Sequence, residues 1–155
     1  MKSIDHNSME RWMSYAILEA KKSQKIDEVP VGAIIVLNNE IVGRGFNQPI
    51  RKKDPTSHAE IEAIRNASKN IGNYRLVDAE IYVTLEPCTM CYGAIVHSRM
   101  SSIFYGASDP KTGVCRSCDD LSQKSYFNHQ PKIIGGILEG DSSRILKEFF
   151  SNKRN

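Results

Sequence analysis

Apolar side chains recur at helical spacing near the start of the chain. Asn7-Ser8-Met9-Glu10 resembles a capping box, the pattern that begins many helices. The apolar positions that follow are Met9, Trp12, Met13, Ala16, Ile17 and Ala20. This stripe predicts a helix with one face buried, and its breadth suits packing on a sheet. Trp12 belongs to the stripe, so core packing is favoured over a base-stacking role for its ring.

Shorter apolar runs predict β-strands along the rest of the chain. The run from Val31 to Leu37 is nearly continuous, which is typical of a strand covered on both faces. Asn38-Asn39 supplies a turn, so this strand and the next are expected to form a hairpin. The predicted strands are Val31–Leu37, Glu40–Phe46, Ala79–Leu85, Ser102–Ala107 and Lys132–Ile137.

Helices are predicted between and after these strands. They run from about Ser57 to Asn70, from about Cys88 to His97, and from a cap at Asp141 onward, while a long polar loop covers Ser108 to about Gln130. A hairpin followed by alternating helices and strands predicts an α/β fold with a five-stranded mixed sheet. Helix-linked strands should run parallel, with helices on both faces of the sheet, which gives one three-layer α/β/α arrangement. Without a repeat or linker, residues 1–155 are expected to form a single domain.

Composition supports a globular protein. Of 155 residues, 40% are hydrophobic and 25% charged, which argues against disorder. No apolar run approaches the roughly 18 residues that a membrane span needs. The segment Met1–His6 lacks the apolar core of a signal peptide, so a cytoplasmic location is expected.

Charge gives only a weak indication of a partner. The formal net charge of +3 permits a polyanionic partner without requiring one. Arg51-Lys52-Lys53 form a basic run in a predicted loop, and Lys153-Arg154 lie at the end of the chain. Phosphate contact and simple solvation both remain open for these two runs.

The cysteines and one histidine indicate a metal site. Cys88 and Cys91 are three residues apart at a predicted helix start, so their sulfurs face the same way and the helix N-terminus favours thiolates. His58, at another predicted helix start, would be the third ligand. One imidazole and two thiolates leave a fourth position open, which is the pattern of catalytic zinc.

Glu60 adds the acid–base group that such a site needs. It lies two residues past His58, where it is poorly placed to bind the same metal but can reach a bound water. Zinc lowers the pKa of that water to about 7, so hydroxide could attack an aromatic amidine carbon while Glu60 shuttles the proton.

Taken separately, each of these sequence patterns also has a simpler interpretation. Ser57 and Glu60 match a capping box, and Cys88-x-x-Cys91 could be a redox pair. The combination of His58-x-Glu60 with Pro87-Cys-x-x-Cys, separated by residues 61–86, favours a zinc deaminase.

Several segments beyond this motif resemble one family, the bacterial tRNA adenosine deaminases of the cytidine deaminase superfamily. They are Val29–Ala33, Asn47–Ile50, Asp54–Ile61, Asn73–Leu76, Tyr82–Cys88, Gly93–Arg99 and Asp109–Gly113. The resemblance implies a cytidine-deaminase-like domain, one zinc ion per subunit and a homodimer. It also implies deamination at C6 of the wobble adenosine in a tRNA anticodon stem-loop, giving inosine.

The resemblance further implies which residues contact the substrate. Asn47 matches a position expected to hydrogen-bond the target nucleoside, although it could simply form a turn. Asp109 and Lys111 match a loop expected near the RNA strand. Arg51, Lys52, Lys53 and the C-terminal basic residues are candidate phosphate contacts.

Cys115 and Cys118 depart from the family pattern. They form a second Cys-x-x-Cys pair in the long polar loop, with His129 as the only nearby candidate for a further ligand. Since a second metal would need two more ligands, free and reduced thiols are expected. The segment Tyr126–His129 and the last helix match the family only loosely.

Two other functions remain as alternatives. An enzyme acting on free bases or nucleosides, such as a guanine or cytosine deaminase, would share His58, Glu60, Cys88 and Cys91. A non-catalytic RNA-binding subunit with structural zinc would have no need of Glu60 beside an open coordination position.

Overall fold

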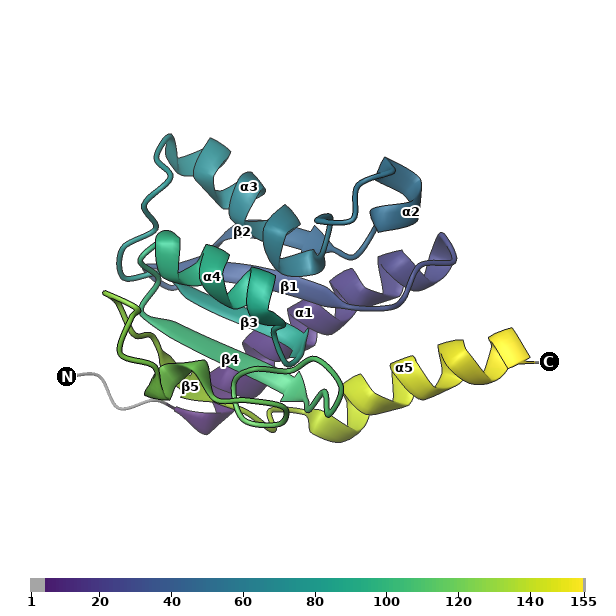
Figure 1. The fold of residues 1–155 in the computed structure, drawn as a ribbon. Coiled ribbons are helices and arrows are strands. Elements are labelled where there is room, and N and C mark those ends of the chain that lie inside the picture. Colours follow the sequence, from purple (N-terminus) through teal and green to yellow (C-terminus); the bar gives the residue numbers. More distant parts are fainter. Residues whose placement is uncertain (1–4, 155) are drawn as a thin grey trace.

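The computed structural model describes residues 5–154 and contains a five-stranded mixed sheet between two layers of helices (Figure 1). The strands are β1 (Gly32–Leu37), β2 (Glu40–Phe46), β3 (Glu80–Leu85), β4 (Ser102–Ala107) and β5 (Lys132–Ile134). The helices are α1 (His6–Lys25), α2 (Pro49–Lys52), α3 (Ala59–Ile71), α4 (Thr89–His97) and α5 (Glu139–Arg154), with a 3-10 turn, η1 (Leu121–Gln123). The predicted α/β class with a five-stranded mixed sheet is confirmed. Residues Met1–Ile4, part of the segment considered for a signal peptide, lie outside the described residues.

Strand directions place the ends of several elements at one edge of the sheet. The strand order is β2-β1-β3-β4-β5. β1 pairs antiparallel with both β2 and β3, while β3 with β4 and β4 with β5 pair parallel. The strands β2, β3 and β4 therefore run the same way, as predicted for helix-linked strands. Their carboxyl ends lie together, next to the beginnings of α3 and α4.

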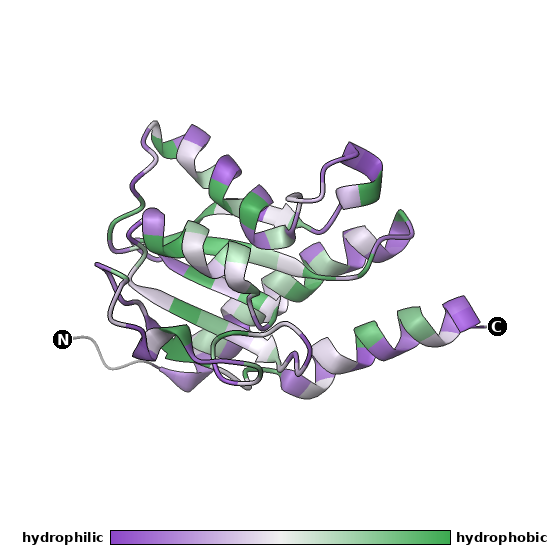
Figure 2. Cartoon of the chain, in the orientation of Figure 1, coloured by the Kyte–Doolittle hydropathy of each residue, from purple (hydrophilic) through white to green (hydrophobic). Residues whose placement is uncertain are grey.

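The two faces of the sheet carry separate cores. On one face α3 and α4 pack on the sheet, with buried residues such as Ala63, Ile81 and Ile95. On the other face α1 and α5 pack around Met13 and Phe104. Figure 2 shows the hydrophobic colouring concentrated along the central strands, with hydrophilic positions toward the outside of the helices.

Trp12 is buried in the core between α1 and the sheet, with 7% of its surface exposed, as its place in the apolar stripe predicts. Within residues 5–154, no helix has both the length and the apolar character needed to cross a membrane.

Several element boundaries differ from the sequence prediction. The N-cap of α1 is Asp5, whose carboxylate accepts the N–H of Asn7 at 3.1 Å, so the helix begins before the expected capping box. β5 ends at Ile134 rather than Ile137, ahead of Gly136 with its φ of 84°. α5 begins at Glu139, which puts Asp141 inside its first turn rather than at its cap.

The loop before α3 contains a short helix that the sequence did not predict. α2 has Pro49 at its start, and the buried carboxylate of Glu28 accepts the N–H groups of Ile50 and Arg51 at 3.2 and 2.9 Å. Those N–H groups have no partner within the helix, so Glu28 satisfies them from outside.

Candidate active site

His58 and Cys88 occupy equivalent places in the fold. Each is the N-cap of its helix, α3 or α4, with an extended backbone and no capping hydrogen bond from its side chain. Both side chains are therefore free to act as ligands. The capping-box alternative for Ser57 and Glu60 is not found, because His58 is the N-cap and the Ser57 hydroxyl donates instead to Glu62 at 2.7 Å.

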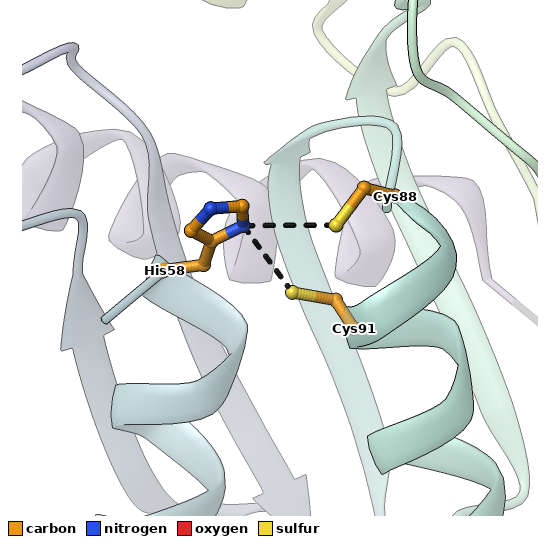
Figure 3. A group of neighbouring side chains, drawn as sticks. All are labelled: His58, Cys88 and Cys91. Atoms are coloured by element: carbon orange, nitrogen blue, oxygen red, sulfur yellow. Dashed lines mark hydrogen bonds between the residues drawn. The ribbon is translucent and has the colours of Figure 1, made fainter. Parts of the chain in front are cut away.

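The structure brings His58, Cys88 and Cys91 together (Figure 3). The Nδ1 atom of His58 lies 3.7 Å from the sulfur of Cys88 and 3.6 Å from that of Cys91. All three ligand atoms lie within 4.8 Å of one another. A tetrahedral zinc ion with ordinary Zn–S and Zn–N bonds separates its ligand atoms by about 3.5–3.8 Å. The donor set and spacing therefore fit zinc.

The pKa values of the two thiols are driven apart. Hydrogen bonds that the Cys88 sulfur accepts from Cys91, and then from His58, lower the pKa of Cys88 to about 4 against the opposing effect of burial. The pKa of Cys91 is raised, because its thiol donates to Cys88 and is buried. The hydrogen bond with Cys88 also raises the pKa of His58. The cluster thus already stabilises one thiolate, the form in which cysteine binds a metal.

Glu60 lies beside this cluster in the first turn of α3. It is 4% exposed, and burial raises the pKa of its carboxyl to about 7. The group of potential metal ligands does not include Glu60, although the residue lines the same cavity as His58 and Cys88. A buried carboxyl with a pKa near neutrality can both accept and release a proton.

A cavity of about 210 Å³ opens over the cluster. Three of its lining residues, Val29, Val31 and Leu85, are apolar, and the others are polar or ionisable side chains that can fix the orientation of a ligand. The lining residues are Val29, Val31, Asn47, His58, Glu60, Leu85, Glu86, Cys88, Asp109 and Thr112.

The three residues predicted to contact substrate lie at or near this cavity. Asn47 lines it, and its side-chain N–H donates to the carbonyl of Val29 at 3.1 Å. Asp109 also lines it, and its carboxylate accepts the N–H groups of Lys111 and Thr112. Lys111 lies outside this lining and borders an adjoining cavity with Asp109, Pro110 and Thr112.

Two further residues at the cavity were given no role from the sequence. Thr112 belongs to the resembling segment Asp109–Gly113, and its hydroxyl donates to Asp109 at 2.7 Å. Glu86 is 3% exposed. Burial acts to raise the pKa of its carboxyl, but hydrogen bonds from Ser117, Asp109 and Arg116 outweigh this effect and hold the pKa below its usual range. Two features of the sequence could have drawn attention to Glu86: it lies in the resembling segment Tyr82–Cys88, and it directly precedes Pro87-Cys88.

Cys115 and Cys118 are free cysteines, as predicted, with Cys115 buried and Cys118 exposed. Within residues 5–154, neither belongs to a group of three potential metal ligands. The ring Nε2 atom of His129 lies 2.6 Å from the carbonyl oxygen of Met100.

Comparison with known proteins agrees with this site. Residues 6–107 match the family model described as the cytidine and deoxycytidylate deaminase zinc-binding region, which places the chain among the zinc-binding deaminases. The chain is also 46% identical over 146 residues to the tRNA-specific adenosine deaminase of Haemophilus influenzae, across 94% of this chain and 84% of that relative. The chain therefore belongs to the tRNA-specific adenosine deaminase family, and the resemblance inferred from its segments is confirmed.

Solved structures agree with the fold. A structure from studies of A-to-I editing by tRNA:A34 deaminases at the wobble position superposes with a TM-score of 0.85 at 40% identity, covering 88% of this chain and 99% of that one. A guanine deaminase from Nitrosomonas europaea superposes with a TM-score of 0.76 at 19% identity, covering 92% of this chain and 84% of that one. The second likeness concerns the fold alone.

Proposed function

We propose that this protein deaminates adenosine to inosine at the wobble position of a tRNA anticodon. Support comes from the relatives called tRNA-specific adenosine deaminase, which match over nearly the whole chain. The proposal treats the chain as one deaminase domain whose partner is the anticodon stem-loop. A hairpin loop suits such an enzyme, because its bases leave the stack at low cost.

The observation that carries the proposal is the position of Glu60. It lies buried beside a three-ligand cluster at the floor of a small cavity. We assign one zinc ion to His58, Cys88 and Cys91; when bound, it would activate water as a Lewis acid. Glu60 would take one proton from the attacking water and pass it to the ring nitrogen of the base; it would then move the remaining hydroxyl proton to the amino group, which leaves as ammonia.

Substrate binding is assigned to the cavity walls. Within residues 5–154, the Oδ1 atom of Asn47 takes part in no intramolecular hydrogen bond, so it can accept one from the target nucleoside. We assign Asp109 and Lys111 to the rim, where the RNA strand would pass. A cavity of about 210 Å³ suits a single extruded base, with the rest of the RNA held outside it.

Assembly and location rest on the family resemblance. We propose a homodimer, the form that the resemblance implies. A cytoplasmic location is proposed because the tRNA substrate is found there.

Inosine formation on two substrates tests the function. Zinc-loaded protein is incubated with an isolated anticodon stem-loop carrying a wobble adenosine and, separately, with free adenosine. We expect inosine in the stem-loop only. A stem-loop with guanosine at the wobble position and adenosine elsewhere in the loop is the control and should stay unchanged. Turnover of free adenosine, with the stem-loop untouched, would assign the protein to nucleoside metabolism instead.

A further inference from the structure

Glu86 is a buried carboxylate held entirely by hydrogen-bond donors of one loop. It begins the β3–α4 connection, directly after Leu85 and before Pro87, and within residues 5–154 it forms no salt bridge. Its Oε1 atom accepts the N–H of Asp109 at 3.1 Å and the hydroxyl of Ser117. Its Oε2 atom accepts the N–H groups of Cys115, Arg116 and Ser117 at 3.0, 2.9 and 3.0 Å.

These donors come from two separate parts of the loop that follows β4. Asp109 lies near the start of this loop, and residues 115–117 follow later in it, before η1. Between them Gly113 passes so close that a Cβ atom there would lie 2.4 Å from the Cδ atom of Glu86. The Glu86 side chain therefore joins the two ends of the segment 109–117.

The same loop forms one wall of the cavity. Asp109 and Thr112 both line it, and the Asp109 carboxylate accepts two hydrogen bonds from Thr112. The position of this wall therefore depends on the bonds that Glu86 accepts.

We propose that Glu86 is a positioning residue for substrate, which holds the loop 109–117 so that Asp109 and Thr112 face the entering base. Its two oxygens already accept five hydrogen bonds, so it acts through the loop rather than by touching substrate or metal. This inference rests on the proposed function only for its choice of substrate.

Glu86→Gln tests the proposal because an amide cannot satisfy both ends of the loop. Whichever way the amide turns, its NH₂ group faces N–H donors of Asp109 or of residues 115–117. Displacement of a cavity wall by about 1 Å can cost up to about 100-fold in rate. We expect kcat/KM on the stem-loop to fall by about 10- to 100-fold, mainly through a higher KM, with zinc content unchanged.

Two other variants make the result specific. Glu19→Gln also removes a buried carboxylate charge, but on α1, where Glu19 pairs with Lys22, and should leave KM unchanged. Ser117→Ala removes a single donor to Glu86 and should raise KM in the same direction by a smaller factor. It also keeps the test valid if Glu86→Gln does not fold.

Several outcomes would overturn the proposal. A lower melting temperature with a wild-type KM in both Glu86→Gln and Ser117→Ala would make the contact merely structural. Loss of zinc would assign Glu86 to the metal site through Cys88. If the wild-type protein turns over a free nucleoside and no RNA, the proposed function fails; the KM comparison is then made on that nucleoside, because the same wall borders the cavity.

Discussion

Glu60 combines deep burial with a position next to the three side chains, His58, Cys88 and Cys91, that could hold a metal ion. As the proposed proton carrier, it should be essential for turnover and dispensable for metal binding. Glu60→Gln keeps the size of the side chain and removes its ability to exchange a proton. We expect activity on the stem-loop to fall by about 100- to 10,000-fold, with zinc content unchanged. Near-wild-type turnover by this variant would rule out the proton-carrier role.

The same substitution has a pH-dependent effect on the stability of the metal-free protein. Burial raises the pKa of Glu60 from 4.5 to about 7, so the folded state favours the neutral carboxyl. The neutral carboxyl's contribution to the free energy of unfolding is fully present below pH 4.5 and is lost as the pH rises to about 7. At pH 8, metal-free Glu60→Gln should therefore be more stable than the metal-free wild type, by at most about 3 kcal/mol. Urea unfolding at pH 4 and pH 8 measures this, and equal stability differences at the two values would contradict it.

At the scale of elements, the junction between β2 and α3 positions two of the site residues. Gly45 of β2 lies against the first turns of α3, where a Cβ atom would come within 2.4 Å of the Ala59 oxygen and the Ala63 nitrogen. Since backbone atoms cannot move aside, Gly45→Ala should shift the start of α3 and with it His58 and Glu60. We expect a loss of about 1–3 kcal/mol in stability, together with weaker zinc binding.

Gly140→Ala is the matched control for Gly45→Ala. A Cβ atom at Gly140, in the first turn of α5, meets nothing within 4 Å. Its stability and zinc affinity should stay close to those of the wild type. Calorimetry and a zinc competition assay measure both quantities, and wild-type zinc affinity in Gly45→Ala would contradict the role given to this junction.

The elements also show what the sequence could and could not predict. The starts of α3 and α4 were predicted from local patterns, and the combination of His58-x-Glu60 with Pro87-Cys-x-x-Cys made the ligand cluster predictable from the sequence. α2 has only four residues and no periodicity, and its support comes from Glu28, 22 residues before Ile50. The hydrogen bonds of Glu86 likewise come from residues 23 to 31 positions further along the chain, in an irregular loop. No local sequence pattern predicts such contacts.

At the scale of the whole molecule, the basic segments project from the same side as the site. Figure 1 shows α2 and the C-terminal end of α5 on the side where α3 and α4 begin. Lys153 of α5 contacts Asp27, and Lys52 of α2 contacts Glu62 at 2.6 Å, so acidic neighbours partly neutralise both. Arg51 is exposed and, within residues 5–154, forms no salt bridge. Arg51 is therefore the basic residue of α2 that is best able to contact an RNA phosphate.

Salt dependence of RNA binding tests this arrangement. If about four phosphates are contacted, the logarithm of affinity should fall with the logarithm of salt concentration with a slope of about −3. Fluorescence anisotropy with a labelled stem-loop measures the dissociation constant from 50 to 200 mM salt, over which affinity should drop by roughly 60-fold. Arg51→Ala should make the slope shallower by about one, whereas Lys21→Ala, on α1 beside α5, should leave it unchanged. A flat response in the wild type would mean that the net charge of +3 has no role in substrate capture, and would favour a small uncharged substrate.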